Sequence, residues 1–286
     1  MLDIGCGKGS FLTGFSQARP GWAYVGVEPS REEAGIARRN PMFEIHEGMF
    51  GGADTGAQPF DLVAIMHVLE HVSDPPAVIA RMHDTLKPGG LAFIEVPHTL
   101  DLNMFYDLLL FEHLFHFTPQ TLSWHLERQG FDIVAADTSS SYGALRMVAR
   151  KRTSPGHPPS LPSELPPMAE GFERWTRMWT RMREVCTVGA ERAASGRRVA
   201  VFGAGMTSAT WLVYSDLFDS PIVGCLDESP WKVGRSFFGR SVHALADLVS
   251  LDLDTLLVAT MPGSQAPVTA KLRRIAPASV EILPFE

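Results

Sequence analysis

Short apolar runs alternate with amphipathic stretches along most of the chain. Runs rich in Val, Ile and Leu predict buried strands, and apolar residues three or four positions apart predict helices between them. In the first half, strands are predicted at 1–4, 23–27, 43–46, 61–65, 91–96, 131–136 and 143–149, and helices at 9–18, 30–39, 76–86 and 119–129. In the second half, strands are predicted at 198–202, 221–226 and 255–259, and helices near 206–218, 243–249 and 264–274. Strand–helix alternation of this kind indicates two α/β domains with parallel, doubly wound sheets.

A proline-rich stretch separates the two halves. Six prolines lie between Pro155 and Pro167, and because proline fixes φ and lacks an N–H, we expect an extended linker there. Residues 168–194 then carry Trp and Met at helical spacing, which predicts a connecting helix with one apolar stripe. The predicted organisation is an α/β domain over 1–152, a linker and connecting helix over 153–195, and a second α/β domain over 196–286.

Composition narrows the class of protein. The 286 residues are 45% hydrophobic and carry a net charge of −7, and neither half has the basic surplus of a nucleic-acid-binding protein. No apolar run reaches the roughly 18 residues of a membrane helix. The cysteines, Cys6, Cys186 and Cys225, lie far apart, which indicates neither a disulfide framework nor a zinc site and fits a cytoplasmic protein. We therefore expect no nucleic-acid or membrane partner and no metal site.

A glycine-rich turn follows the first predicted strand. Gly5, Gly7 and Gly9 stand between that strand and a predicted helix, and glycine lets such a turn bend tightly and approach a ligand. Asp3 precedes the turn, and Glu28 ends the second predicted strand. A carboxylate at that strand end can accept hydrogen bonds from both hydroxyls of a ribose. For Asp3, an alternative is that its carboxylate holds the turn through backbone N–H groups.

Taken in order, these features resemble a known family. The Gly-x-Gly-x-Gly turn after Asp3 and the runs Phe60–Val63, His67–Val72 and Leu86–Leu91 are similar to the signatures of class I S-adenosylmethionine-dependent methyltransferases across residues 1–150. The resemblance implies a seven-stranded sheet whose last strand is antiparallel, and S-adenosylmethionine as the cofactor. The residues that it places around the cofactor are Asp3, Gly5, Gly7, Gly9, Glu28, Met66 and His67. Glu70 and His71 are expected to hold the loop after the fourth strand.

Segments after the fifth strand bear on the methyl acceptor. Leu110–His113 and Gly143–Arg146 resemble two runs of the sugar C-methyltransferases, which act on nucleotide-linked keto sugars and end in a second Rossmann-like domain. The first run departs from their Tyr-His-Glu-His pattern at the Tyr and the first His, and the zinc domain with which they begin is not in this sequence. An alternative is a methyltransferase of other specificity, in which Thr118 simply caps the helix after the Glu-His pair.

Methylation at carbon sets its own chemical requirements. The carbon must lose a proton next to a carbonyl before it can attack the methyl group, which calls for a base with a pKa near 7 and a donor for the enolate oxygen. The resemblance therefore implies that His113 is the base and that Glu112 orients it. Tyr106 or His116 would take the place of the missing enolate donor, and Arg146 would contact the substrate.

A second glycine turn opens the C-terminal domain. Gly203 and Gly205 follow the strand at 198–202, Thr207 lies at the start of the next helix, and Asp227 stands 22 residues after Gly205. This arrangement predicts a nucleotide-binding shape. The resemblance implies that these residues hold the nucleotide part of the substrate, with a phosphate at the helix N-terminus. The alternative is a turn that serves only close packing of the helix on the strand.

The preferred interpretation is thus an S-adenosylmethionine-dependent enzyme that methylates a nucleotide-linked keto sugar at carbon. O- or N-methylation of a small metabolite or glycan is an alternative. A binding or scaffold module with a degenerate cofactor pocket is another, which the intact glycine turn and Glu28 oppose. A nicotinamide-dependent activity in the second domain is the last. The sequence leaves the acceptor and the oligomeric state open.

Overall fold

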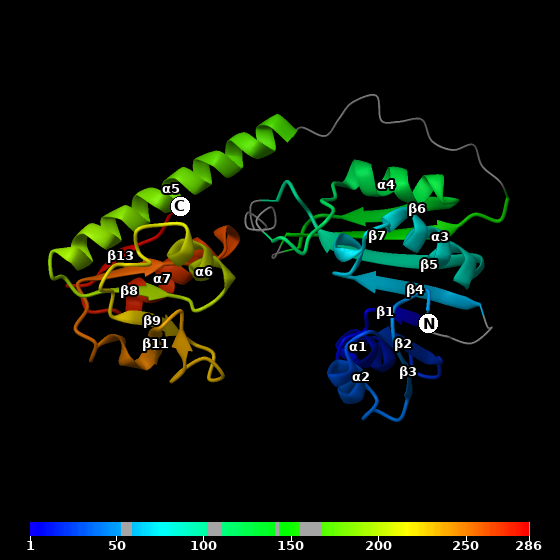
Figure 1. Cartoon of the computed structure of the whole chain (residues 1–286), viewed down its shortest axis with the longest axis horizontal. Coiled ribbons are helices and arrows are strands. Elements are labelled where there is room, and N and C mark those ends of the chain that lie inside the picture. Colours follow the sequence, from blue (N-terminus) through cyan, green and yellow to red (C-terminus); the bar gives the residue numbers. More distant parts are fainter. Residues whose placement is uncertain (53–58, 102–109, 141–142, 155–167, 286) are drawn as a thin grey trace. The chain divides into compact units, whose positions relative to one another are not determined.

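The computed structural model describes residues 1–52, 59–101, 110–140, 143–154 and 168–285. These residues form two compact units, 1–166 and 167–286, each described here by itself (Figure 1). Within the described residues, no helix combines the length and the apolar character needed to span a membrane. All three cysteines are buried free thiols.

The first unit is built on a seven-stranded sheet with the order β3-β2-β1-β4-β5-β7-β6. Strands β1 to β5 run parallel, while β7 is antiparallel to both β5 and β6. This confirms the predicted α/β class and the seven-stranded sheet that ends in an antiparallel hairpin. The strands are β1 (Leu2–Ile4), β2 (Tyr24–Glu28), β3 (Phe43–Glu47), β4 (Phe60–Met66), β5 (Leu86–Pro97), β6 (Phe131–Asp137) and β7 (Ala144–Lys151).

Apolar runs place the central strands in the core. Consecutive residues of β1 and of the second half of β4 are buried, so both faces of the sheet are covered there, as expected for parallel strands flanked by helices. The helices of this unit are α1 (Ser10–Ala18), α2 (Arg31–Ala37), α3 (Pro75–Thr85) and α4 (Pro119–Arg128), with a short 3₁₀ helix η1 (Leu69–His71). Asp74 caps α3 by accepting from Ala77 N at 3.0 Å. Thr118 caps α4 by accepting from Thr121 N at 3.3 Å, a contact that the sequence analysis gave as part of its alternative for this segment.

The strand order positions the site of the first unit. Because β1 lies between β2 and β4, the chain crosses to opposite sides of β1, and the carboxyl ends of these three strands meet at a topological switch point. Open α/β sheets bind their ligands at such a point. The glycine turn after β1, Glu28 at the end of β2 and His67 after β4 are therefore brought together by topology.

The second unit has a six-stranded sheet with the order β10-β11-β9-β8-β12-β13, in which only the β10–β11 pair is antiparallel. The strands are β8 (Val199–Phe202), β9 (Gly224–Asp227), β10 (Ser236–Phe237), β11 (Arg240–Ala244), β12 (Thr255–Val258) and β13 (Glu281–Leu283). The helices are α5 (Met168–Ala194), α6 (Met206–Val213) and α7 (Gln265–Ile275). This Rossmann-like sheet agrees with the predicted second α/β unit.

Several features of the second unit differ from the sequence predictions. Strands β10, β11 and β13 were not predicted. The helix predicted near 243–249 is wrong, because Val242 to Ala244 pair with β9 and only Leu245–Leu248 form a 3₁₀ turn. Helix α5, assigned from sequence to the connector, belongs to the compact second unit. Its side chains Met178, Met182 and Cys186 are buried, which explains the apolar stripe.

Candidate functional site

The glycine turn after β1 is built from backbone conformations that favour glycine. Gly5, Gly7 and Gly9 have φ values of 71°, 53° and 80°, in the left-handed region that L-residues with a side chain rarely adopt. A Cβ on Gly5 would lie 2.3 Å from Cγ2 of Val68, so the turn also packs too closely for any side chain there. The N–H groups of Gly5 and Cys6 donate to the Val27 carbonyl at 2.8 and 3.1 Å, which ties the turn to β2.

Glu28 holds the same turn from the end of β2. Its Oε2 accepts from Gly7 N at 2.9 Å, and its Oε1 accepts from Ser30 N at 2.7 Å. The side chain is only 7% exposed. The structure therefore brings the predicted acid and the predicted glycine turn into direct contact, and the role of Glu28 toward a ribose stays a prediction.

Asp3 lies beneath the turn as a fully buried acid. Neither of its carboxylate oxygens has a hydrogen-bond partner among the described residues. Burial raises the pKa of Asp3 to about 8, with a further contribution from the charge of Glu28. The alternative that Asp3 holds the turn through backbone N–H groups is thus wrong. The turn therefore covers the Asp3 carboxyl group, which has no hydrogen-bond partner among the described residues.

A cavity of about 700 Å³ opens at these strand ends. Its volume is in the range of small-molecule and cofactor sites. Five of the seven predicted cofactor residues line it: Gly5, Gly7, Glu28, Met66 and His67. Its walls are completed by apolar side chains, among them Phe50, Val68, Val72 and Leu114. The other two predicted cofactor residues, Asp3 and Gly9, are not among the residues that line the cavity.

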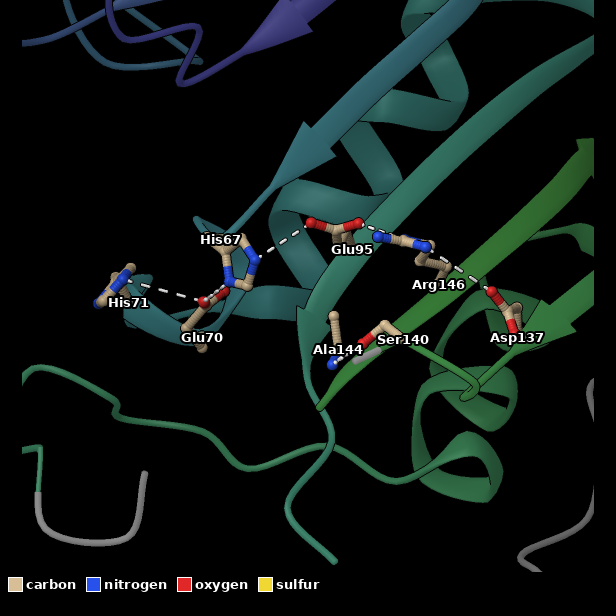
Figure 2. A network of polar contacts seen from close by, with 8 residues as sticks. All are labelled: His67, Glu70, His71, Glu95, Asp137, Ser140, Ala144 and Arg146. Carbon is tan, nitrogen blue, oxygen red and sulfur yellow. Dashed lines mark hydrogen bonds and ion pairs between the residues drawn. The ribbon is translucent and has the colours of Figure 1, made fainter. Parts of the chain in front are cut away.

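A network of charged side chains runs from the edge of this cavity across the sheet (Figure 2). His67, at φ 51°, places Nδ1 3.3 Å from Glu70 Oε1 and Nε2 3.1 Å from Glu95 Oε1. Glu95 in turn accepts from Arg146 Nε at 2.6 Å, and Arg146 lies 3.8 Å from Asp137. Hydrogen bonds that the His67 ring donates to Glu70 and to Glu95 raise the pKa of His67 to about 9, with the bond to Glu70 the larger cause, so its imidazole is protonated at neutral pH.

The network changes the interpretation of Arg146 and reveals one further residue, Glu95. Glu95 and Arg146 are direct cross-strand neighbours on β5 and β7, so the guanidinium is engaged by a buried carboxylate; its predicted contact with substrate stays a prediction. Sequence reasoning did not assign Glu95, although a glutamate near the end of an otherwise apolar strand is a signal for a paired or functional acid. Glu70 holds its loop as predicted, because its carbonyl accepts from Leu114 N at 2.8 Å.

The segment at 110–117 joins the site through His71. The His71 and His113 rings meet edge to face, with centroids 4.7 Å apart. His71 Nδ1 donates to the Glu112 main-chain carbonyl at 2.9 Å, while the side chains of Glu112 and His116 are exposed. Tyr106 lies outside the described residues. The contact between His71 and His113, the predicted base, joins two segments that are far apart in the sequence. No spacing pattern in the sequence predicts this contact.

The glycine turn of the second unit is closed by its own acid. Asp227 Oδ2 accepts from Ala204 N at 2.8 Å and lies 3.2 Å from Lys232 Nζ, and Oδ1 accepts from Ser229 N at 2.8 Å. Burial acts to raise the pKa of Asp227, but these hydrogen bonds and the lysine outweigh it and lower the pKa. Gly203 has φ 99° and Thr207 is buried. A smaller cavity of about 400 Å³ lies beside Asp227, Val233 and Leu245.

A glycine turn after β1, an acid at the end of β2 and a cavity at the switch point define a Rossmann-like cofactor site. The antiparallel β7 at the far side of the sheet gives the first unit the class I methyltransferase fold. Residues 1–136 match a family model described as a methyltransferase domain. The first unit is thus similar to methyltransferase domains in the order of its sheet and in the sequence of residues 1–136.

Comparison with known proteins extends the similarity beyond this domain. The chain is 26% identical to the C-methyltransferase NovU of Streptomyces niveus in an alignment of 265 positions that covers 85% of this chain and 61% of that protein. It is 33% identical to the ubiquinone biosynthesis O-methyltransferase of Photorhabdus laumondii over 99 residues, 32% of this chain and 40% of that protein. The chain therefore spans less than two thirds of each.

Similar solved structures cover about half of this chain. An S-adenosylmethionine-dependent methyltransferase from Mesorhizobium loti superposes on 52% of this chain and 89% of its own, with a TM-score of 0.44 and 19% identity.

Proposed function

We propose that the chain is an S-adenosylmethionine-dependent methyltransferase and that the 700 Å³ cavity of the first unit binds this cofactor. The observation that carries the proposal is the convergence of Gly5, Gly7, Glu28, Met66 and His67 on one cavity at the switch point. A glycine turn without side chains admits the cofactor close to the backbone, and an acid at the end of β2 offers oxygens to ribose hydroxyls.

The acceptor that we propose is a nucleotide-linked keto sugar, methylated at carbon. The match to NovU supports methylation at carbon, because that relative is a C-methyltransferase and the match covers 85% of this chain and so extends into the second unit. The match to the ubiquinone O-methyltransferase stops after 99 residues. Gly203, Gly205, Thr207 and Asp227 would then hold the nucleotide part of the acceptor.

The reaction proposed for this site would take place in two steps, proton removal and then methyl transfer. A base removes the proton from the carbon beside the carbonyl, and the resulting enolate carbon attacks the methyl group of the sulfonium. The carbon–methyl bond forms as the sulfur–methyl bond breaks, and S-adenosylhomocysteine leaves. His113 is the proposed base. It lies against His71, and both His71 and the neighbouring Leu114 line the cavity.

The experiment follows methyl transfer from labelled S-adenosylmethionine to a panel of nucleotide-linked keto and hydroxy sugars, in deuterated water, with product mass spectrometry. We expect methylation of a keto sugar with solvent exchange at the carbon beside the carbonyl. His113→Ala should lose both, whereas His46→Gln, on β3 and outside the cavity lining, should keep both.

Transfer to a hydroxyl without exchange would replace the proposed acceptor by an O-methylation. Cofactor binding without transfer to any sugar would leave a methyltransferase of another acceptor. A folded chain that binds no S-adenosylmethionine would overturn the proposal as a whole.

A further inference from the structure

Three side chains that could ligate a metal meet beside the cavity. Glu70 and His71 lie on η1, and His113 reaches them from the segment at 110–117. One ligand atom from each lies within 4.8 Å of the other two. Sequence spacing did not indicate this cluster, because η1 and the His113 segment are distant along the chain and approach only in the fold.

The two segments of the cluster are fastened to each other through the main chain. Leu114 N and Phe115 N both donate to the Glu70 carbonyl, at 2.8 and 3.2 Å. His71 Nδ1 lies 2.9 Å from the Glu112 carbonyl. These bonds are independent of the three side-chain ligand atoms, so the backbone holds the cluster together whether or not a ligand is present.

The hydrogen bond of His71 also fixes which nitrogen can bind a ligand. A carbonyl only accepts, so Nδ1 carries the proton and the lone pair lies on Nε2. That Nε2 lies 3.9 Å from Glu70 Oε1. Histidines that bind metals characteristically give their other ring N–H to a carbonyl or carboxylate, which sets the tautomer and the ring orientation. His71 is therefore oriented as a metal-binding histidine would be.

Glu70 supplies a buried anion at the base of the cluster. Its side chain is 1% exposed, Oε1 lies 3.3 Å from His67 Nδ1, and Oε2 has no hydrogen-bond partner among the described residues. A buried carboxylate with an unused oxygen has the capacity to take a cation.

We propose that Glu70, His71 and His113 bind one divalent transition-metal ion of the zinc class. Two imidazoles and one carboxylate form the ligand set of catalytic zinc sites, which keep a further position open. Bonds of about 2.0–2.2 Å in a tetrahedron separate ligand atoms by about 3.4 Å, so side-chain rotations must draw the three atoms together from their present spacing. The open position would face the cavity, whose lining includes His71 and Leu114.

This ion would affect the reaction through His113, an effect that rests on the proposed function. A nitrogen that binds a metal cannot accept a proton, so an ion held by Glu70, His71 and His113 would occupy the lone pair that the proposed base needs. We therefore expect the metal-free chain to transfer the methyl group and the metal-loaded chain to lose this activity.

The test is a titration of the full chain, stripped with EDTA, with Zn²⁺ by calorimetry and with Co²⁺ by visible absorption. We expect one ion per chain and the absorption bands of four- or five-coordinate Co²⁺. His71→Ala and His113→Ala should each weaken the affinity at least about tenfold, and Glu70→Gln should do the same. His46→Gln is the matched control, since His46 lies 2.9 Å from Glu44 outside the cluster and should leave binding unchanged.

Two results would overturn the metal site: no stoichiometric binding by a chain that is folded by circular dichroism, or binding that none of the three variants weakens. Folding of each variant is checked by thermal unfolding. His71→Ala and His113→Ala test the metal site independently of each other, because the two ligands lie on different segments. Binding of S-adenosylmethionine is measured on the same samples. Transfer by the metal-free chain that stoichiometric Zn²⁺ leaves unchanged would overturn the effect on His113 and leave the proposed function standing. Stoichiometric metal binding by a chain that transfers no methyl group even when metal-free would leave the metal site and overturn the proposed function.

Discussion

Replacement of Gly5 by alanine tests the glycine turn where the structure makes it tightest. The new Cβ would lie 2.3 Å from Val68 Cγ2 and 3.5 Å from Val68 Cβ. The first distance is a severe overlap and the second is an ordinary contact. A Cβ at φ 71° adds backbone strain of about 1–2 kcal/mol, and overpacking adds about 1–3 kcal/mol. We expect Gly5→Ala to lower the free energy of unfolding by about 2–5 kcal/mol, the sum of these two ranges.

The two contributions can be separated with Val68→Ala. This substitution removes both Cγ atoms of Val68 and leaves its Cβ, which lies in ordinary contact distance, 3.5 Å, of a Cβ at position 5. The double variant should therefore keep only the backbone strain. A double-mutant cycle by urea unfolding should therefore show a coupling of about 1–3 kcal/mol between the two positions. Binding of S-adenosylmethionine, measured by calorimetry, should weaken in Gly5→Ala and recover in part in the double variant.

Gly35→Ala is the matched control for this cycle. Gly35 lies within α2, and a Cβ built there meets nothing within 4 Å. Alanine favours a helix interior over glycine by roughly 0.8–1.0 kcal/mol, so this variant should be slightly more stable than the parent. Additive effects of Gly5→Ala and Val68→Ala, or a Gly5→Ala chain as stable as Gly35→Ala, would refute the reasoning.

Three further predictions concern charge and the second unit. The pKa of Asp3 is raised to about 8, so its contribution to the free energy of unfolding is complete below its unfolded pKa of 3.8 and is lost as the pH rises toward 8. At pH 7, Asp3→Asn should therefore be more stable than the parent by on the order of 2–4 kcal/mol. Urea titrations should show that this difference vanishes near pH 4. The pKa of His67 is raised to about 9, so the contribution of its protonated ring to the free energy of unfolding is complete below pH 6.5 and is lost as the pH rises through 9. Between pH 7 and 10, the parent should therefore lose stability more steeply than His67→Gln. Parallel stability curves for the two proteins would contradict this. A Cβ on Gly203 would lie 2.9 Å from the Ala259 carbonyl, so Gly203→Ala should lower the thermal stability of the second unit by about 1–3 kcal/mol and leave S-adenosylmethionine binding unchanged in calorimetry.

Local patterns were sufficient to predict the first unit. The apolar run of β1, the glycines after it and the helical spacing of α1 are signals that lie within a few residues of one another. Their order along the chain fixes a right-handed crossover and so the meeting of strand ends at the switch point. This is why five predicted residues reach one cavity without any information beyond the sequence.

The side-chain network and the metal cluster could not be predicted in this way. Glu95 meets Arg146 because β7 pairs antiparallel with β5 in one particular register, and register is set by the packed sheet rather than by either strand alone. His113 meets His71 because main-chain bonds join its segment to η1. Both contacts belong to tertiary structure.

The errors in the second unit have the same origin. The sequence Leu-Ala-Asp-Leu after β11 resembles a helix start, and the structure gives it only one 3₁₀ turn, with Asp247 accepting from Ala244 N at 3.0 Å. The preceding Val242 is drawn into the sheet by its pairing with Cys225 on β9. Short strands of this kind have too few residues for a periodic signal.

Calorimetric titration of the full chain with S-adenosylmethionine tests the central claim most directly. The account predicts one site per chain, in the cavity lined by Gly5, Gly7 and Glu28, with affinity that falls in Gly5→Ala and that excess NAD does not reduce. A folded chain that shows no heat of binding at any concentration, or one whose binding is unchanged in Gly5→Ala, would contradict it.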